Sequence, residues 1–199
     1  MINYLGVIQI RENISSLTFF VLLLITAVVG ISGCQENGTN SESTDTSGVT
    51  LQDSVLNDTE INSLIYMREE EKLARDVYLY LYDKWNIPIF RNIAASEQEH
   101  TDAVKSLLTQ YGVQDPASTT SEGEFTNPEL QELYNQLIQQ GSVSREDALK
   151  VGVIIEEKDI RDLEADLANT TNSDIKIVYG NLLRGSNNHL SAFNTQLGK

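Results

Sequence analysis

Residues 96–104, SEQEHTDAV, place a carboxylate and an imidazole on the buried side of a predicted helix. Glu97 and His100 are three residues apart, so on a helix they lie about 60° from each other and point toward the same spot. Apolar residues at Ile93, Val104 and Leu107 follow helical spacing and put both polar residues in the stripe that faces the core. A soluble helix normally carries leucine-like side chains there, so the pair indicates a specific buried partner.

Apolar spacing of three and four residues predicts five helices, and no segment shows the sustained alternation expected of a strand. The predicted helices run from about 59 to 85, from Pro88 to a stop at Gly112, from Pro128 to Gly141, from an N-cap at Ser144 to about 170, and from about Ser173 onward. The fold class is therefore all-α.

Four of these helices are long, and their apolar stripes repeat near 3.5 residues, which favours a bundle with helices crossing at about 20°. The short loop at Asn86 makes the first two helices an antiparallel hairpin, and the loop near residue 170 does the same for the last two. The connection 112–143 contains the short third helix. It is long enough to travel the length of the bundle as one long crossover.

Each long stripe is interrupted by the same two residue types. The first helix contributes Glu71, the second Glu97 and His100, the fourth Glu156 and the fifth His189. Glu71 and Glu156 lie in runs of acids, so only the register of the stripe selects the buried member of each run. On the fourth helix that stripe is predicted as Leu149, Gly152, Glu156, Ile160, Leu163 and Leu167.

Three buried carboxylates need a neutralising partner. Burying one ionised carboxylate costs several kcal/mol even after relaxation. Three would together rival the whole stability of a domain, which is roughly 5 to 15 kcal/mol. Carboxylate and imidazole ligands from facing helices suit divalent iron, manganese or zinc, and a metal would neutralise all three acids at once.

The layout resembles the ferritin-like superfamily, whose di-iron or di-manganese members place a Glu on two helices and Glu-x-x-His on the other two. An uncharacterised ferritin-like domain-of-unknown-function family of bacteria and archaea has similar stretches, and the resemblance covers essentially all of residues 59–199. The first two helices are also similar to rubrerythrin. These resemblances rest on MREEEKLARDVY (67–78), FRNIAASEQEH (90–100), ALKVGVIIEEKDIRDL (148–163) and LLRGSNNHLSAF (182–193). They imply a ferritin-like antiparallel four-helix bundle that binds two iron or manganese ions.

The resemblance implies that the metal ligands are Glu71, Glu97, His100, Glu156 and His189. One position departs from the pattern, because Ser186 stands where an acid should precede His189 by three residues. Two divalent ions then lack one negative charge, which water, hydroxide, a substrate anion, Glu70 or Glu157 would supply. Two alternatives remain open. The site holds a single metal, or it holds none and His189 forms a hydrogen bond with a carbonyl in the core. Tyr78 is expected to pack in the core or to donate a hydrogen bond beside the metals.

The N-terminus carries an export signal of its own. Residues 17–32, LTFFVLLLITAVVGIS, are unbroken by charge, and Ile31-Ser32-Gly33-Cys34 resembles the lipobox at which a cysteine is lipidated. We predict a signal peptide at 1–33, a lipidated Cys34 with a polar tether at 34–58, and one domain at 59–199. The alternative is an uncleaved anchor helix. Both predictions hold the domain at the cell membrane, on its extracytoplasmic face.

Composition excludes some classes of partner and site. The net charge of -15 makes nucleic acid an unfavourable partner. Cys34 is the sole cysteine, so neither an intrachain disulfide nor a cysteine metal site is available. A homodimer is compatible with these features, whereas a lipid anchor disfavours a closed ferritin cage.

Two functions from different classes fit the sequence. The first is a di-iron type oxidoreductase that handles oxygen, peroxide or ferrous iron, with an open coordination position at Ser186 and room for a small oxidant beside Gly185. Since no rubredoxin-like segment accompanies the domain, its electron donor would be a separate protein. The second is a non-catalytic metal-binding or structural module, in which Glu71, Glu97 and His100 form a closed polar network.

Overall fold

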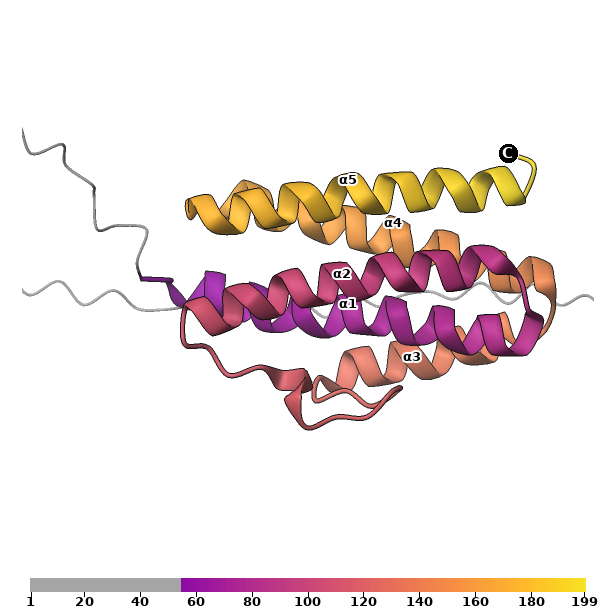
Figure 1. The fold of residues 1–199 in the computed structure, drawn as a ribbon, viewed down its shortest axis with the longest axis horizontal. Helices are drawn as coiled ribbons and strands as arrows, with labels where there is room; N and C mark the ends of the chain where they lie inside the picture. Colours follow the sequence, from indigo (N-terminus) through magenta and orange to yellow (C-terminus); the bar gives the residue numbers. More distant parts are fainter. Residues whose placement is uncertain (1–54) are drawn as a thin grey trace, which may run out of the picture. The chain divides into compact units, whose positions relative to one another are not determined.

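The structure, a computed structural model, describes residues 55–199, and its regular elements there are all helical. They are α1 (Asp58–Trp85), α2 (Pro88–Gln110), the short 3₁₀ helix η2 (Pro116–Ser118), α3 (Pro128–Gly141), α4 (Arg145–Asn169) and α5 (Ser173–Gln196), as Figure 1 shows. The all-α prediction and its five α-helices are confirmed. The predicted signal peptide, Cys34 and nearly all of the predicted tether lie outside the described residues. Within 55–199, no helix has both the length and the apolar character needed to cross a membrane.

The helix ends follow local chemistry that the sequence encodes. Asn57 forms a capping box at the start of α1, in which its side chain accepts from Glu60 N and the Glu60 side chain accepts from Asn57 N. The Ser144 side chain caps α4 in the predicted way, by accepting from Asp147 N. Asn86 adopts the left-handed conformation, with φ 49° and ψ 44°, and this reverses the chain between α1 and α2.

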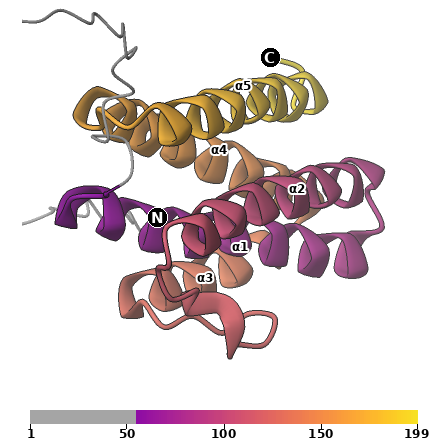
Figure 2. The same ribbon diagram turned by 60° about the vertical axis from the view of Figure 1, so that its left-hand side comes forward.

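The four long helices lie alongside one another as two hairpins. α1 packs along α2 and α4 packs along α5, while further contacts join α1 to α4 and α2 to α5. Figures 1 and 2 show the two hairpins side by side, with α3 against α1 and α4 on the side away from α5. Each long helix therefore contributes one face to a shared interior.

That interior consists of two apolar clusters with a polar layer between them. The Phe90 cluster is centred on Tyr78, Phe90, Val151 and Phe193. The Met67 cluster is centred on Leu64, Met67, Val104, Tyr179 and Leu182. All four long helices contribute to both clusters, and the polar residues that interrupt the stripes lie where each helix passes from one cluster to the other.

The connection between α2 and α3 is fastened to α1 by buried charged side chains. Arg68 makes two hydrogen bonds to the Asp115 carboxylate, of 3.1 and 3.2 Å. Lys72 Nζ donates to the carbonyl oxygens of Ser121 and Glu124 at 2.7 and 3.0 Å. Much of the charge buried on α1 is therefore used to hold this long connection.

The buried face of α4 differs by one step from the predicted stripe. Its buried residues are Ala148, Val151, Gly152, Ile155, Glu156, Asp159 and Leu163. Ile160 is only partly buried, although it was the predicted member of the stripe. Positions three and four residues after Glu156 lie about 60° and 40° from it on opposite sides, so hydrophobicity alone favoured the isoleucine. The packing of α4 against α1 and α5 turns the aspartate inward instead.

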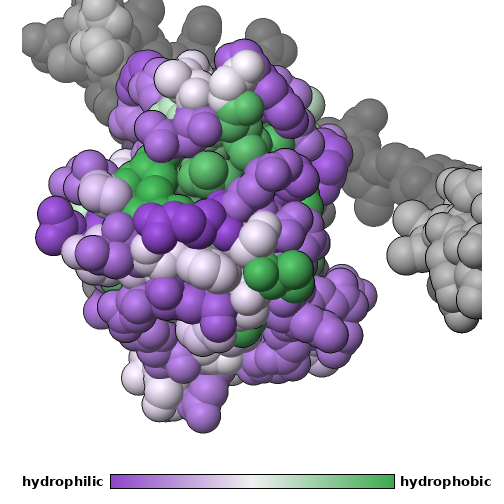
Figure 3. All heavy atoms as spheres, turned by 90° about the vertical axis from the view of Figure 1, so that its right-hand side faces the viewer, coloured by the Kyte–Doolittle hydropathy of each residue, from purple (hydrophilic) through white to green (hydrophobic). Residues whose placement is uncertain are grey.

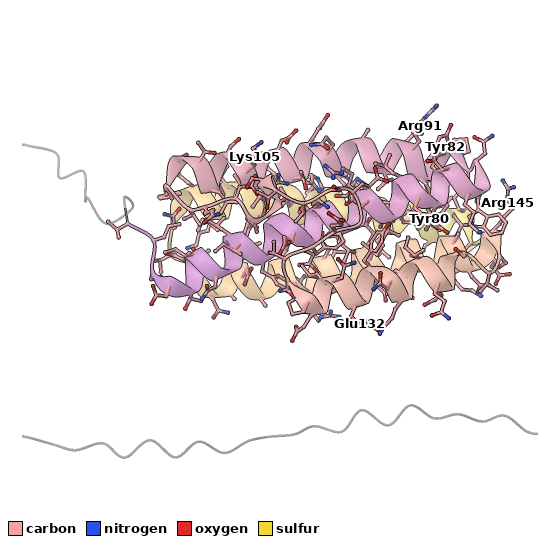
Figure 4. The ribbon with its side chains drawn as sticks, turned by 90° about the horizontal axis from the view of Figure 1, so that it is seen from below. Tyr80, Tyr82, Arg91, Lys105, Glu132 and Arg145 are labelled. Atoms are coloured by element: carbon pink, nitrogen blue, oxygen red, sulfur yellow. The ribbon has the colours of Figure 1, made fainter. Side chains whose placement is uncertain are left out.

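The outer surface is mainly polar. Arg91, Lys105 and Glu132 are exposed, and their side chains point away from the helices in Figure 4. Figure 3 looks onto the end that carries the α1–α2 turn and the C-terminus, where apolar side chains gather in patches bordered by polar ones.

Candidate metal centre

The polar layer contains two groups of metal-ligating side chains that share one residue. Glu71, Glu97 and His100 form one group, and Glu97, Glu156 and His189 form the other. Within each group the ligand atoms lie within 4.8 Å of one another. The structure thus brings together all five residues that the resemblance implied, from four different helices.

Glu97 lies between the two histidines and turns one oxygen toward each. Its Oε2 is 2.8 Å from His100 Nδ1, and its Oε1 is 2.8 Å from His189 Nδ1. The two imidazole rings are nearly parallel, with centroids 5.6 Å apart. A carboxylate with its two oxygens directed at different ligand sets is suited to bridge two ions.

Glu71 and Glu156 lie on either side of this central unit. Glu71 Oε2 is 3.3 Å from His100 Nδ1, and Glu156 Oε2 is 3.5 Å from His189 Nδ1. Tyr78 donates a hydrogen bond of 2.6 Å from its hydroxyl to Glu156 Oε1. The three glutamates are 1 to 2% exposed, and each histidine side chain is 11% exposed.

Three consecutive glutamates on α1 have three separate roles. Glu69 accepts hydrogen bonds from Thr126 and from the backbone of Asn127, at the N-terminus of α3. Glu70 pairs with Lys158 on α4. Glu71 alone belongs to a metal-ligating group. The stripe register therefore selects the member of this acid run that faces the centre.

Both histidines are oriented by neighbours that sequence reasoning did not identify. Gly185 on α5 lies against the His100 ring, and a Cβ atom added at Gly185 would sit 2.5 Å from His100 Nε2. His189 Nε2 is 3.0 Å from Ser96 Oγ, so an Nε2–H that donates to Ser96 leaves the Nδ1 lone pair directed at the centre. The expected space for a small oxidant beside Gly185 was wrong, because the His100 ring fills it.

The remaining predicted positions divide between the interior and the surface. Glu157 is solvent-exposed and lies outside both groups. Ser186 is fully buried, but it donates a hydrogen bond to Asp159 Oδ2 and does not leave an open position. Asp159 itself was missed. The available signal was its spacing of three residues from Glu156, which repeats the spacing of Glu97 and His100.

The charges in this layer are strongly coupled. Burial raises the pKa of Glu71 and Asp159 well above their ordinary values. Burial, together with the charge of Glu97, raises the pKa of Glu156 to about 7. Although burial raises the pKa of Glu97, hydrogen bonds from the two histidines lower it to about 2.

In the two histidines, burial and the neighbouring charges shift the pKa in the opposite directions. Burial lowers their pKa values, but hydrogen bonds and charge from Glu71 and Glu97 raise the pKa of His100 to about 11. Glu156 and Glu97 likewise raise the pKa of His189 to about 9. In the absence of a cation, this layer therefore attracts protons, which means that it favours positive charge at its centre.

The donor set fits a metal ion. Glu71 Oε1 and Asp159 Oδ1 are buried and have no hydrogen-bond partner within residues 55–199. Buried oxygens without a donor are costly, and a cation placed among them would remove that cost. These buried glutamate and histidine groups can therefore hold a metal ion.

A small cavity of about 20 Å³ lies next to this layer, between α1, α3 and α4. That volume is enough for roughly one water molecule. Asp159, Glu70 and Lys158 form its polar part, and its apolar walls are Leu73, Ala74, Leu133, Leu137, Ile154 and Ile155.

Comparison with known proteins assigns the family. The model of the family described as "Uncharacterized protein domain (DUF2202)" matches residues 60–199. The chain belongs to this family. The match covers all five α-helices almost completely, and it includes every residue of the two metal-ligating groups.

A curated relative and a solved structure have the same source. The chain is 56% identical over 138 residues to the uncharacterized protein MJ0754 of Methanocaldococcus jannaschii, which covers 69% of this chain and 75% of the relative. It also matches the crystal structure of hypothetical protein MJ0754 with a TM-score of 0.71 and 55% identity, over 72% of this chain and 82% of that one. The helical architecture is therefore similar to that of an experimentally determined relative.

Proposed function

We propose that this chain is a ferritin-like four-helix bundle that binds two iron or manganese ions and uses them in redox chemistry at the cell surface. The position of Glu97 carries the proposal, because its two oxygens are each 2.8 Å from a different histidine. Glu71, Glu97 and His100 would hold one ion, and Glu97, Glu156 and His189 would hold the other.

The side chains around the centre bind and orient the ligands and exclude water. Ser96 and Gly185 hold the two imidazoles in place. Tyr78 keeps a proton directed at Glu156, and the rings of Phe90 and Phe193 close the layer on that side. The two apolar clusters exclude bulk water, which strengthens every electrostatic interaction between them.

The reaction proposed is with oxygen, peroxide or ferrous iron. Bound iron or manganese supplies the capacity to exchange electrons with a small oxidant, which these side chains lack. The small cavity beside the layer favours a substrate of few atoms. Because the sequence has a single cysteine, we propose that the electron donor is a separate protein. We place the domain at the membrane through a lipidated Cys34, as the lipobox-like segment predicts.

The test is metal content, measured by elemental analysis on the full chain purified in detergent without added metal. We expect close to two iron or manganese ions per chain, and their loss in Glu97→Ala. Glu99→Ala is the matched control, because Glu99 is an exposed acid two residues away on the same helix. Loaded protein should then consume peroxide or oxidise ferrous iron faster than the free metal does. A folded wild-type chain that takes up neither metal when offered would refute the proposal.

A non-catalytic metal-binding or structural module is the second candidate. The observation that favours it is the direct pairing of both histidines with Glu97, which gives a polar network without any ion. If the chain is such a non-catalytic module, His189→Ala would leave its metal content unchanged. A chain that binds metal but shows no catalytic turnover would favour a role in metal sequestration.

A further inference from the structure

The proposed function leaves one charge unaccounted for. Two divalent ions carry four positive charges, whereas Glu71, Glu97 and Glu156 supply three negative ones. Of the acids considered to fill the gap, Glu157 is exposed and Glu70 is paired with Lys158. The structure points to a different carboxylate.

Asp159 lies against Ser186, the position at which the ferritin-like pattern would place the missing charge. It follows Glu156 by three residues on α4, and Ser186 precedes His189 by three residues on α5, so both pairs share a helix face. Ser186 donates a hydrogen bond to Asp159 Oδ2, which joins these two faces. The carboxylate that the family pattern would place at position 186 is thus present beside that position, on the neighbouring helix.

Asp159 is buried without an ion-pair partner among the described residues. The residue is 4% exposed, and its Oδ1 has no hydrogen-bond partner among the described residues. Lys158 precedes Asp159 in the sequence, but its amine pairs with Glu70 and Asp162. Within residues 55–199, no lysine or arginine forms an ion pair with Asp159.

Glu71 is the ionisable neighbour that affects Asp159 most. After burial, the charge of Glu71 is the largest influence that raises the pKa of Asp159. Glu71 Oε1, like Glu70 Oε2 beside it on α1, is also buried without a hydrogen-bond donor among the described residues. A cation held between Glu71 and Asp159 would remove the cost of leaving both of their orphaned oxygens buried.

We propose that Asp159 is the fourth carboxylate ligand of the metal centre, acting with Glu71 and His100 in place of an acid at position 186. Ser186 then fixes Asp159 Oδ2 and leaves Oδ1 for the metal. The small cavity that Asp159 lines has room for a water molecule to complete the coordination. This inference rests on the proposed function, since it assigns a ligand to the same centre.

The test is calorimetric titration of the metal-stripped full chain with Mn²⁺, together with metal content by elemental analysis. We expect Asp159→Ala and Asp159→Asn to weaken the binding of one ion at least about 100-fold, which exceeds the roughly 10- to 100-fold effect of removing an outer partner of a ligand. Glu157→Ala, which removes the exposed acid two residues earlier, should bind both ions as the wild type does. Circular dichroism would verify that each variant is folded.

A rescue variant distinguishes a metal ligand from a residue that only stabilises the fold. Asp159→Ala combined with Ser186→Glu returns a carboxylate to the same layer from the adjacent helix, and it should restore binding of the second ion. Unchanged affinities in both single variants would overturn the role of Asp159 and leave the two-metal centre standing. A folded wild-type chain that binds neither Mn²⁺ nor iron would overturn both proposals.

Discussion

Glu97 is the residue on which both metal-ligating groups depend, whereas each histidine belongs to one group only. A bridging carboxylate and a terminal imidazole should therefore respond differently to removal. This difference separates a centre with two ions from a single site surrounded by polar residues.

We predict that His100→Ala and His189→Ala each lower the metal content from two ions to one, while Glu97→Ala removes both. The physical reason is that each imidazole is close to a different oxygen of Glu97. Elemental analysis of the three variants beside the wild type measures the effect. A loss of both ions in each histidine variant would indicate one shared site instead.

At the scale of the element, α5 packs so closely on α2 that the residue at position 185 has no room for a side chain. The His100 ring fills the space that a Cβ would take. The position of the His100 ring on α2 is therefore determined partly by a glycine on α5. Gly180 lies on the same helix and offers a matched control, because a Cβ there would meet nothing within 4 Å.

We predict that Gly185→Ala destabilises the domain by about 1 to 3 kcal/mol through overpacking. The same variant should weaken metal binding, since the His100 ring must move. Gly180→Ala should instead stabilise by up to about 1 kcal/mol, as alanine does in a helix interior, and should keep its metal affinity. Urea denaturation and Mn²⁺ titration measure both effects, and equal behaviour of the two variants would contradict the packing argument.

At the scale of the whole molecule, the buried polar layer links folding to protonation. Glu156 and Glu70 both have a pKa of about 7 in the folded chain, against 4.5 in the unfolded one. A raised pKa stabilises the fold at pH values below 4.5, and this contribution is lost as the pH rises through 7. His100 and His189 lose their contribution progressively as the pH rises from 6.5, the unfolded value, to about 11 and 9, the folded values. The pKa of Glu97 is lowered from 4.5 to about 2, so its contribution is lost progressively as the pH falls between these values.

We predict that the metal-free chain becomes less stable between pH 5 and 8, while Mn²⁺ stabilises it increasingly over that range. The reason is that the metal needs deprotonated carboxylates and neutral imidazoles, so binding releases protons. Thermal denaturation at several pH values, with and without Mn²⁺, measures the difference in melting temperature. Glu97→Ala should show no such metal effect, and a pH-independent difference in the wild type would contradict the linkage.

The sequence alone determined the helices and most of the polar layer, for local reasons. Asn57, Asn86, Pro88 and Ser144 act at helix ends through their own backbone and side-chain chemistry, which neighbouring residues in the chain are enough to specify. Helical periodicity likewise set the register that points Glu71, Glu97 and His100 inward. These features depend on spacings of three or four residues, which are visible in the sequence.

The tertiary structure decided the details that involve two helices at once. The choice between Asp159 and Ile160 was open at the level of one helix, because both lie near Glu156 and only the partner helices differ. Ser186 read as a gap in the metal site, but across the helix interface it holds the Asp159 carboxylate. Gly185 read as open space, but it receives the His100 ring. Contacts between helices far apart in sequence leave no periodic trace, so only the packed interior determines how the buried centre is completed.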